Sequence, residues 1–143
     1  MNDTAYEAAA RMILRRPHTI KELTQKLRQK NFVADDIEAA LATLKESHHL
    51  DDAKLAQQFV EWHIQYKPMG RRALRFTMMK KGFETSDIDT SLTQLTSEIE
   101  RDLAQRLIEQ RASKGVVARD KLARFLLSRG FDNETVLTLL EGK

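Results

Sequence analysis

The feature that most constrains the fold is a sequence pattern that occurs three times. Three thirteen-residue segments align without gaps: IKELTQKLRQKNF from Ile20, RRALRFTMMKKGF from Arg71 and RDKLARFLLSRGF from Arg119. Each has a leucine at its fourth position and a leucine or methionine four residues later, so the two side chains share one face of a helix. A chain with such an internal repeat is expected to fold as a tandem array of similar units.

Each segment also carries a helix stop signal at its end. A basic residue is followed by asparagine or glycine and then by phenylalanine. The residue before the phenylalanine is Asn31, Gly82 or Gly130, and these residue types readily adopt the positive φ found just after a helix. The phenylalanine then stands where a Schellman motif makes its hydrophobic contact. The sequence therefore predicts that each helix ends at this point.

Apolar residues with helical spacing flank each segment on both sides. The residues five and nine positions after each phenylalanine are Ile37 and Leu41, Ile88 and Leu92, and Val136 and Leu140. Upstream, an i, i+3, i+4 set recurs as Ala9, Met12 and Ile13, then Ala56, Phe59 and Val60, then Ala104, Leu107 and Ile108. These patterns predict an all-α protein of three tandem three-helix repeats, spanning residues 1–49, 50–97 and 98–143. Because such a unit buries little core alone, the repeats are expected to stack into an elongated, curved molecule.

Polar residues near the expected helix starts predict N-caps. Thr19 with Glu22, and Ser97 with Glu100, have the spacing of a capping box. Asp51 is expected to cap the first helix of the second repeat. The predicted caps of the third helices are Asp35, Ser86 and Asn133.

The composition agrees with a helical fold and excludes several others. Five glycines and two prolines in 143 residues are too few for a sheet protein with many tight turns. The absence of cysteine excludes disulfides, thiol nucleophiles and cysteine-ligated metal sites, and it fits a reducing cytoplasm. No stretch approaches the apolar length of a membrane span, and the N-terminus lacks the order of a signal peptide. A cytoplasmic location without membrane contact is expected.

No group of residues in the sequence indicates catalysis. There is no recognisable nucleophile with a base, no carboxylate pair typical of acid–base catalysis and no glycine-rich phosphate loop. His48, His49, Asp51 and Asp52 offer metal donors, but adjacent histidines on a helix diverge by about 100° and no zinc-type spacing is present. We therefore expect no catalytic residue, no metal, no cofactor and no small-molecule substrate.

Positive charge is concentrated in the second half of the chain. The net charge is only +3, but residues 67–83 contain six basic and no acidic residues, and residues 101–130 contain eight basic against three acidic. Arg71 and Arg72 stand in a predicted first helical turn, where the macrodipole disfavours cations. Two guanidiniums beside uncapped amides form an anion site for a phosphate or a partner's carboxylates. The alternative, a merely solvated helix face, stays open at this point.

Several of these residues together resemble the RecX family, the bacterial regulators of the RecA recombinase. The most specific are Leu50-Asp51-Asp52, Phe59-Val60, Gly70-Arg71 with Leu74, and Lys81-Gly82-Phe83, and the likeness covers nearly the whole chain. It implies three three-helix repeats in a protein that is not an enzyme. It also implies binding to RecA and its DNA filament, with modulation, usually inhibition, of strand exchange, ATP hydrolysis and filament growth. Two features depart from the family pattern, namely His63 in place of an arginine and Lys67-Pro68-Met69 in place of an aromatic–glycine pair.

The residues and the resemblance together predict a curved modulator that docks on a recombinase filament through basic side chains. The predicted contact residues are Lys67, Arg71, Arg72 and Arg75 in the second repeat and Arg119, Lys121, Arg124 and Arg129 in the third. The runner-up interpretation is a nucleic-acid-binding protein that acts without a recombinase and uses residues 71–81 as a recognition helix. The oligomeric state stays open, because an exposed Trp62 or Met79 would offer an apolar surface for pairing two copies.

Overall fold

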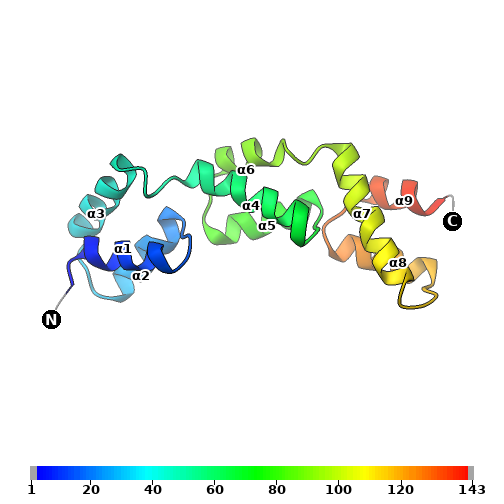
Figure 1. Ribbon diagram of the computed structural model, residues 1–143, viewed down its shortest axis with the longest axis horizontal. Coiled ribbons are helices and arrows are strands. Elements are labelled where there is room, and N and C mark those ends of the chain that lie inside the picture. Colours follow the sequence, from blue (N-terminus) through cyan, green and yellow to red (C-terminus); the bar gives the residue numbers. More distant parts are fainter. Residues whose placement is uncertain (1–2, 142–143) are drawn as a thin grey trace.

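The computed structural model describes residues 3–141, and in that range the chain forms nine α-helices and no strand. The helices are α1 (Ala5–Arg15), α2 (Ile20–Gln29), α3 (Ala34–Glu46), α4 (Asp52–Tyr66), α5 (Arg71–Lys81), α6 (Thr85–Leu92), α7 (Ser97–Ala112), α8 (Arg119–Ser128) and α9 (Asn133–Glu141). They form three groups of three that lie in a row, with α1 and α9 near opposite ends of a gently arched molecule (Figure 1). The prediction of an elongated all-α array of three-helix repeats is confirmed.

Two of the predicted N-caps are present. The Thr19 hydroxyl accepts a hydrogen bond from the Glu22 amide at 3.1 Å, and the Glu22 carboxylate accepts one from the Thr19 amide at 2.9 Å. Asp51 accepts a hydrogen bond from the Lys54 amide at 3.1 Å. These side chains satisfy amides that have no partner within their own helix, which fixes where α2 and α4 begin.

The capping box predicted at Ser97 is wrong. Helix α7 takes Thr96 as its N-cap, so Ser97 lies inside the helix and Glu100 is free to contact another repeat. The caps predicted for the third helices are also wrong, because those helices start one or two residues earlier than the patterns suggest. Asp35, Ser86 and Asn133 all lie within the helices that begin at Ala34, Thr85 and Asn133.

All three predicted helix stops are confirmed. Asn31, Gly82 and Gly130 have φ values of 70°, 96° and 89°. In each case the amide of the next phenylalanine donates to the carbonyl five residues earlier, at 3.2 Å. The pairs are Phe32 with Leu27, Phe83 with Met78 and Phe131 with Leu126. This is the Schellman hydrogen bond expected from the sequence.

The hydrophobic core is divided unequally among the repeats. The first repeat has its own cluster around Leu23, Leu27 and Ile37, whereas the second and third repeats share one cluster that extends from Ala56 to Leu140. Apolar burial therefore joins the second and third repeats. The first cluster also includes Leu50, at the start of the second repeat.

Neighbouring repeats meet through the same kind of joint. At the first joint the hydroxyl of Thr19, the N-cap of α2, donates to the carbonyl of Lys81 at 2.6 Å. At the second joint the amide of Gly70, the N-cap of α5, donates to the carbonyl of Arg129 at 2.8 Å. Lys81 and Arg129 are equivalent residues that precede the helix-stop glycines. In both joints, therefore, the start of one repeat's second helix contacts the end of the next repeat's second helix.

A carboxylate from the following repeat completes each joint. Asp52, in the first turn of α4, accepts a hydrogen bond from the amide of Ile20 at 3.2 Å. Glu100, in the first turn of α7, accepts one from the amide of Arg71 at 2.7 Å. Burial raises the pKa of Asp52, and the hydrogen bond from Ile20 partly opposes that rise. Each acid thus caps a helix of the preceding repeat, where negative charge also interacts favourably with the helix dipole.

Two glycines allow the second joint to close. A Cβ atom at Gly70 would overlap the backbone of Gly130, and one at Gly130 would overlap Ala73. The backbones of the two repeats therefore touch at a place that has no room for a side chain.

Two histidines are buried in the neutral form. The Nδ1 atom of His18 lies 2.8 Å from the carbonyl of Arg16, and its Nε2 atom lies 3.0 Å from the ammonium of Lys26. Because an ammonium only donates, Nε2 accepts and Nδ1 carries the proton. His63 is also buried and contacts the Phe59 carbonyl through Nδ1 at 2.9 Å. Burial lowers the pKa of both imidazoles, against the opposing effect of these carbonyl hydrogen bonds.

Acidification from about pH 7 to about pH 5 is expected to lower the free energy of unfolding. In the unfolded chain both histidines take up protons near their ordinary pKa of about 6.5, whereas the folded protein resists protonation until a lower pH. The stability contribution is therefore fully present above the unfolded-state pKa, and it is lost as the pH falls from there through the lower pKa of the folded protein. Urea unfolding at a series of pH values should show a smaller loss in a His18→Gln/His63→Gln variant. If the native protein and the variant lost equal stability on acidification, His18 and His63 would not be its cause.

Candidate partner-binding groove

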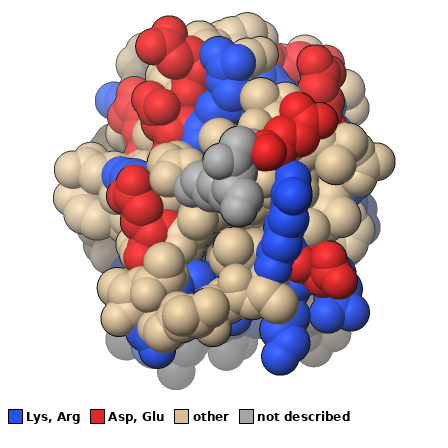
Figure 2. All heavy atoms as spheres, turned by 90° about the vertical axis from the view of Figure 1, so that its right-hand side faces the viewer, with Lys and Arg blue, Asp and Glu red and all other residues tan. Residues whose placement is uncertain are grey.

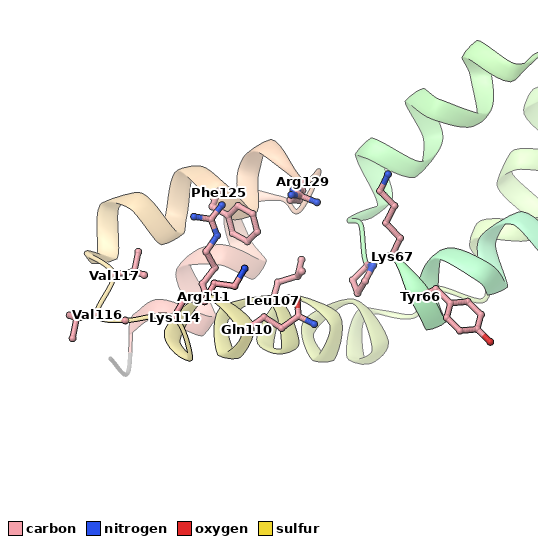
Figure 3. Close-up of a pocket in the computed structure, with 12 residues that line it drawn as sticks. Tyr66, Lys67, Leu107, Gln110, Arg111, Lys114, Val116, Val117, Phe125 and Arg129 are labelled. Atoms are coloured by element: carbon pink, nitrogen blue, oxygen red, sulfur yellow. The ribbon is translucent and has the colours of Figure 1, made fainter.

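A groove lies between the second and third repeats, where the end of α4 faces α7 and α8 (Figure 3). Its volume is about 610 Å³. Four basic residues line it: Lys67 after α4, Arg111 in the last turn of α7, Lys114 in the turn that follows, and Arg129 at the end of α8. Its lining includes no aspartate or glutamate. We call this feature the cationic groove.

Phe125 organises two of the four charges. The guanidinium carbon of Arg111 lies 3.9 Å from the centroid of the Phe125 ring, and that of Arg129 lies 5.0 Å from it. Figure 3 shows Arg111 alongside the ring. Stacking of this kind uses the flat face of a guanidinium and leaves the N–H groups at its edge to donate hydrogen bonds. Phe125 therefore holds two cations in place inside the groove.

The cations of the groove have no acidic partner. Within residues 3–141 the ion pairs are Arg11 with Asp3, Arg16 with Glu22, and Arg75 with Asp89, and none of them involves the groove. Four uncompensated positive charges around a partly apolar hollow concentrate positive potential there. The arrangement suits an anionic group of a partner, held by charge-assisted hydrogen bonds.

The structure brings Lys67 and Arg129 together in the groove and places the other six predicted contact residues elsewhere. The guanidinium of Arg71 donates to the carbonyl of Leu92 at 3.2 Å and to that of Leu95. The expectation that the start of α5 is uncapped is wrong, because Glu100 accepts the hydrogen bond of the Arg71 amide. Arg71 therefore ties α5 to the end of α6 and to the segment that follows it.

Arg72 and Arg75 also make contacts with other residues of the same chain. The Arg72 guanidinium donates to the carbonyl of Leu127 in the third repeat at 3.1 Å. Arg75 forms an ion pair with Asp89 at 2.7 Å, and both side chains are exposed to solvent. An exposed ion pair of this kind contributes little stability, on the order of 0 to 1 kcal/mol, so a partner can compete for Arg75 at small cost.

The remaining predicted residues, Arg119, Lys121 and Arg124, are exposed on α8. Figure 2 looks onto the end of the molecule formed by the third repeat and shows acidic side chains interspersed with basic ones there. The end face is therefore not uniformly positive.

Sequence reasoning missed Arg111, Lys114 and Phe125 as parts of one site. A signal was present, because Arg111 and Lys114 lie in the basic stretch of residues 101–130. Their convergence with Lys67 depends on how the repeats are joined. Over the described part of the chain, no group of three potential ligands is placed to hold a metal ion, and no helix is long and apolar enough to span a membrane.

Comparisons with known proteins identify the family. A model described as "RecX, first three-helix domain" matches residues 5–44, and "RecX, second three-helix domain" matches residues 51–92. Regulatory protein RecX of Chlorobaculum tepidum is 33% identical over 134 residues, which cover 93% of this chain and 84% of that protein. The same-named protein of Clostridium perfringens is 31% identical over 132 residues, and the match spans only 61% of its length.

A solved structure shows the same fold. The crystal structure of RecX from Lactobacillus salivarius matches with a TM-score of 0.84 at 22% identity, covering 96% of this chain and 93% of the other. The likeness thus extends across all three repeats, beyond the two that the family models match. The family models and the sequence matches lead to one conclusion: the chain belongs to the RecX family of regulatory proteins.

Proposed function

We propose that this protein regulates the RecA recombinase by docking on the RecA–DNA filament, and that docking inhibits ATP hydrolysis and filament growth. Membership of a regulatory family supports this proposal. The main support for the proposed docking site is the cationic groove. Its four basic side chains have no acidic partner within the described residues.

The shape of the molecule supports a mode of action without catalysis. Three repeats joined end to end present a long surface, which suits contact with several subunits of a polymer better than it suits enclosure of a small substrate. When the three repeats bind across neighbouring RecA subunits, they oppose the subunit movements that ATP hydrolysis requires. They also oppose the addition of subunits by which the filament grows. Electrostatic attraction speeds the encounter and apolar contacts prolong it, so binding weakens as salt concentration rises. Arg119, Lys121 and Arg124 provide a second, weaker contact.

Charge reversal in the groove is the direct test. A Lys67→Glu/Arg111→Glu/Lys114→Glu variant leaves Arg129 and the joint intact. We expect it to require at least about tenfold more protein for half-inhibition of DNA-dependent ATP hydrolysis by RecA, because attraction becomes repulsion at the docking surface. Circular dichroism and urea unfolding would verify that the variant is folded.

Two further variants make the test specific. Arg15→Glu/Arg28→Glu/Lys30→Glu makes the same change in charge on exposed residues of the first repeat. It should inhibit almost as well as the native protein, and an equal loss would show that net charge rather than the groove matters. Arg119→Glu/Lys121→Glu/Arg124→Glu tests the second contact and should give an intermediate loss.

The interpretation as a nucleic-acid-binding protein that acts alone is tested in parallel. Binding to single-stranded DNA is measured with and without RecA and a slowly hydrolysed ATP analogue. We expect tight binding only when the filament is present. Tight binding to naked DNA that RecA leaves unchanged would overturn the proposed function.

A further inference from the structure

The cationic groove has a composition that distinguishes between two kinds of anionic ligand. Guanidinium and ammonium groups bind carboxylates and phosphates alike, so charge alone leaves both an acidic peptide and a nucleic acid backbone as ligands. The uncharged residues that line the groove differ from those that typically contact a nucleic acid. The inference that follows rests on the proposed function, because it names the chemistry of the partner at the same groove.

The aromatic ring beside the cations of the groove is already in contact with two of them. Proteins that bind single strands stack successive bases on exposed aromatic rings. Phe125 lines the groove, but the guanidinium of Arg111 already covers its ring at 3.9 Å and that of Arg129 lies 5.0 Å from the centroid. Tyr66 also lines the groove and is exposed, but its ring points away from the cluster of cations (Figure 3).

Aliphatic side chains line the same groove as the charges. Pro68, Val116 and Val117 line the groove, and Val116 is fully exposed at 105% relative accessibility. Leu107 also lines it but is buried in the shared core. A hydrated phosphodiester chain gains nothing from covering such surface. A large apolar side chain of a peptide removes it from water, which is favourable in proportion to the area covered.

The charges also stand on both sides of the joint. Lys67 belongs to the second repeat, whereas Arg111, Lys114 and Arg129 belong to the third. Figure 3 shows Lys67 on the second repeat and the other three cations on the third. A ligand that reaches all four must carry several anionic groups along its length. A short peptide with acidic residues on either side of an apolar one meets this requirement.

We infer that the cationic groove binds a short acidic peptide segment of the partner protein that carries at least one large apolar side chain. The carboxylates of the segment bind Lys67 on one side and the cations of the third repeat on the other. Its apolar side chain covers Val116 and Val117. The two guanidiniums on Phe125 are already oriented, so little side-chain freedom is lost when they bind.

A fluorescein-labelled peptide, in which aspartates and glutamates flank one leucine and one phenylalanine, tests this inference with the native protein. Fluorescence anisotropy measures binding. A matched peptide has serine in place of the leucine and phenylalanine, and an oligothymidylate of equal charge serves as competitor. We expect the apolar peptide to bind about tenfold more tightly than the serine peptide. The oligothymidylate should displace it only at much higher concentration.

Variants separate the apolar contribution to peptide affinity from the electrostatic one. Val116→Ser changes no charge at a fully exposed position and should reduce the difference between the peptides. Lys67→Glu/Arg111→Glu/Lys114→Glu should abolish binding of both. The inference is overturned if the serine peptide binds as tightly as the apolar one, or if oligothymidylate competes as well as unlabelled peptide.

Failure of this inference is distinguishable from failure of the proposed function. If the charge-reversal variant no longer inhibits RecA while native protein binds neither peptide, docking at the groove stands and its peptide ligand is wrong. If that variant loses the peptide but inhibits RecA normally, the peptide site stands and the proposed role of the groove in docking is wrong.

Discussion

Replacing Gly130 by alanine is expected to lower the free energy of unfolding by about 3 kcal/mol or more. The residue has φ +89°, a region in which a Cβ atom is strained, and the new methyl group would overlap Ala73 of the second repeat. Both effects act at the joint whose backbones touch. Urea unfolding followed by circular dichroism measures the change.

Alanine substitutions at two other glycines measure the backbone strain and the steric overlap separately. Gly115 has φ +135° but no atom within 4 Å of an added Cβ, so Gly115→Ala should cost only backbone strain, about 1 to 2 kcal/mol. Gly70 has φ −76°, so Gly70→Ala brings overlap with Gly130 and no φ strain, and should cost about 1 to 3 kcal/mol. If Gly70→Ala is as stable as the native protein, the joint is not closed as described.

Phe131→Ala is expected to lower the free energy of unfolding by about 3 to 5 kcal/mol. The ring is fully buried in the cluster shared by the second and third repeats, so its removal leaves a cavity that the surroundings fill only in part. The same urea titration measures the loss.

Phe32 provides the matched control for this substitution. It follows Asn31 in the same helix-stop motif and makes the same amide hydrogen bond, but its side chain is only partly buried against the core of the first repeat. Phe32→Ala should therefore cost about 1 to 2 kcal/mol. Equal costs at the two positions would mean that the motif itself, and not the burial of its ring, determines stability.

The helices and their stops were predictable because their determinants are local. Leu23, Leu74 and Leu122 mark one face of the second helices, and the following Asn or Gly can adopt a positive φ irrespective of distant residues. Thr19 capped its helix as predicted for the same reason, since its partner Glu22 is three residues away.

The roles of Arg71 and Glu100 depend on residues far away in the sequence. Their local patterns predicted an anion site and a capping box, yet the two residues meet across the second joint, 29 positions apart. A carboxylate from the next repeat supplies the cap that the sequence around Arg71 lacks. The cationic groove was unpredictable for a similar reason, because Lys67 and Phe125 converge only when the repeats have been placed.

The acid that completes each joint also bears on whether copies of this protein polymerise. In the alignment of the repeats, the position of Asp52 and Glu100 is occupied by the buried Ala5 in the first repeat. A second molecule offering its first repeat to the exposed start of α8 would bring a methyl group where the internal joints bring a carboxylate. A joint between two molecules would therefore lack the carboxylate that caps a helix at each internal joint. This difference disfavours the growth of open-ended fibres.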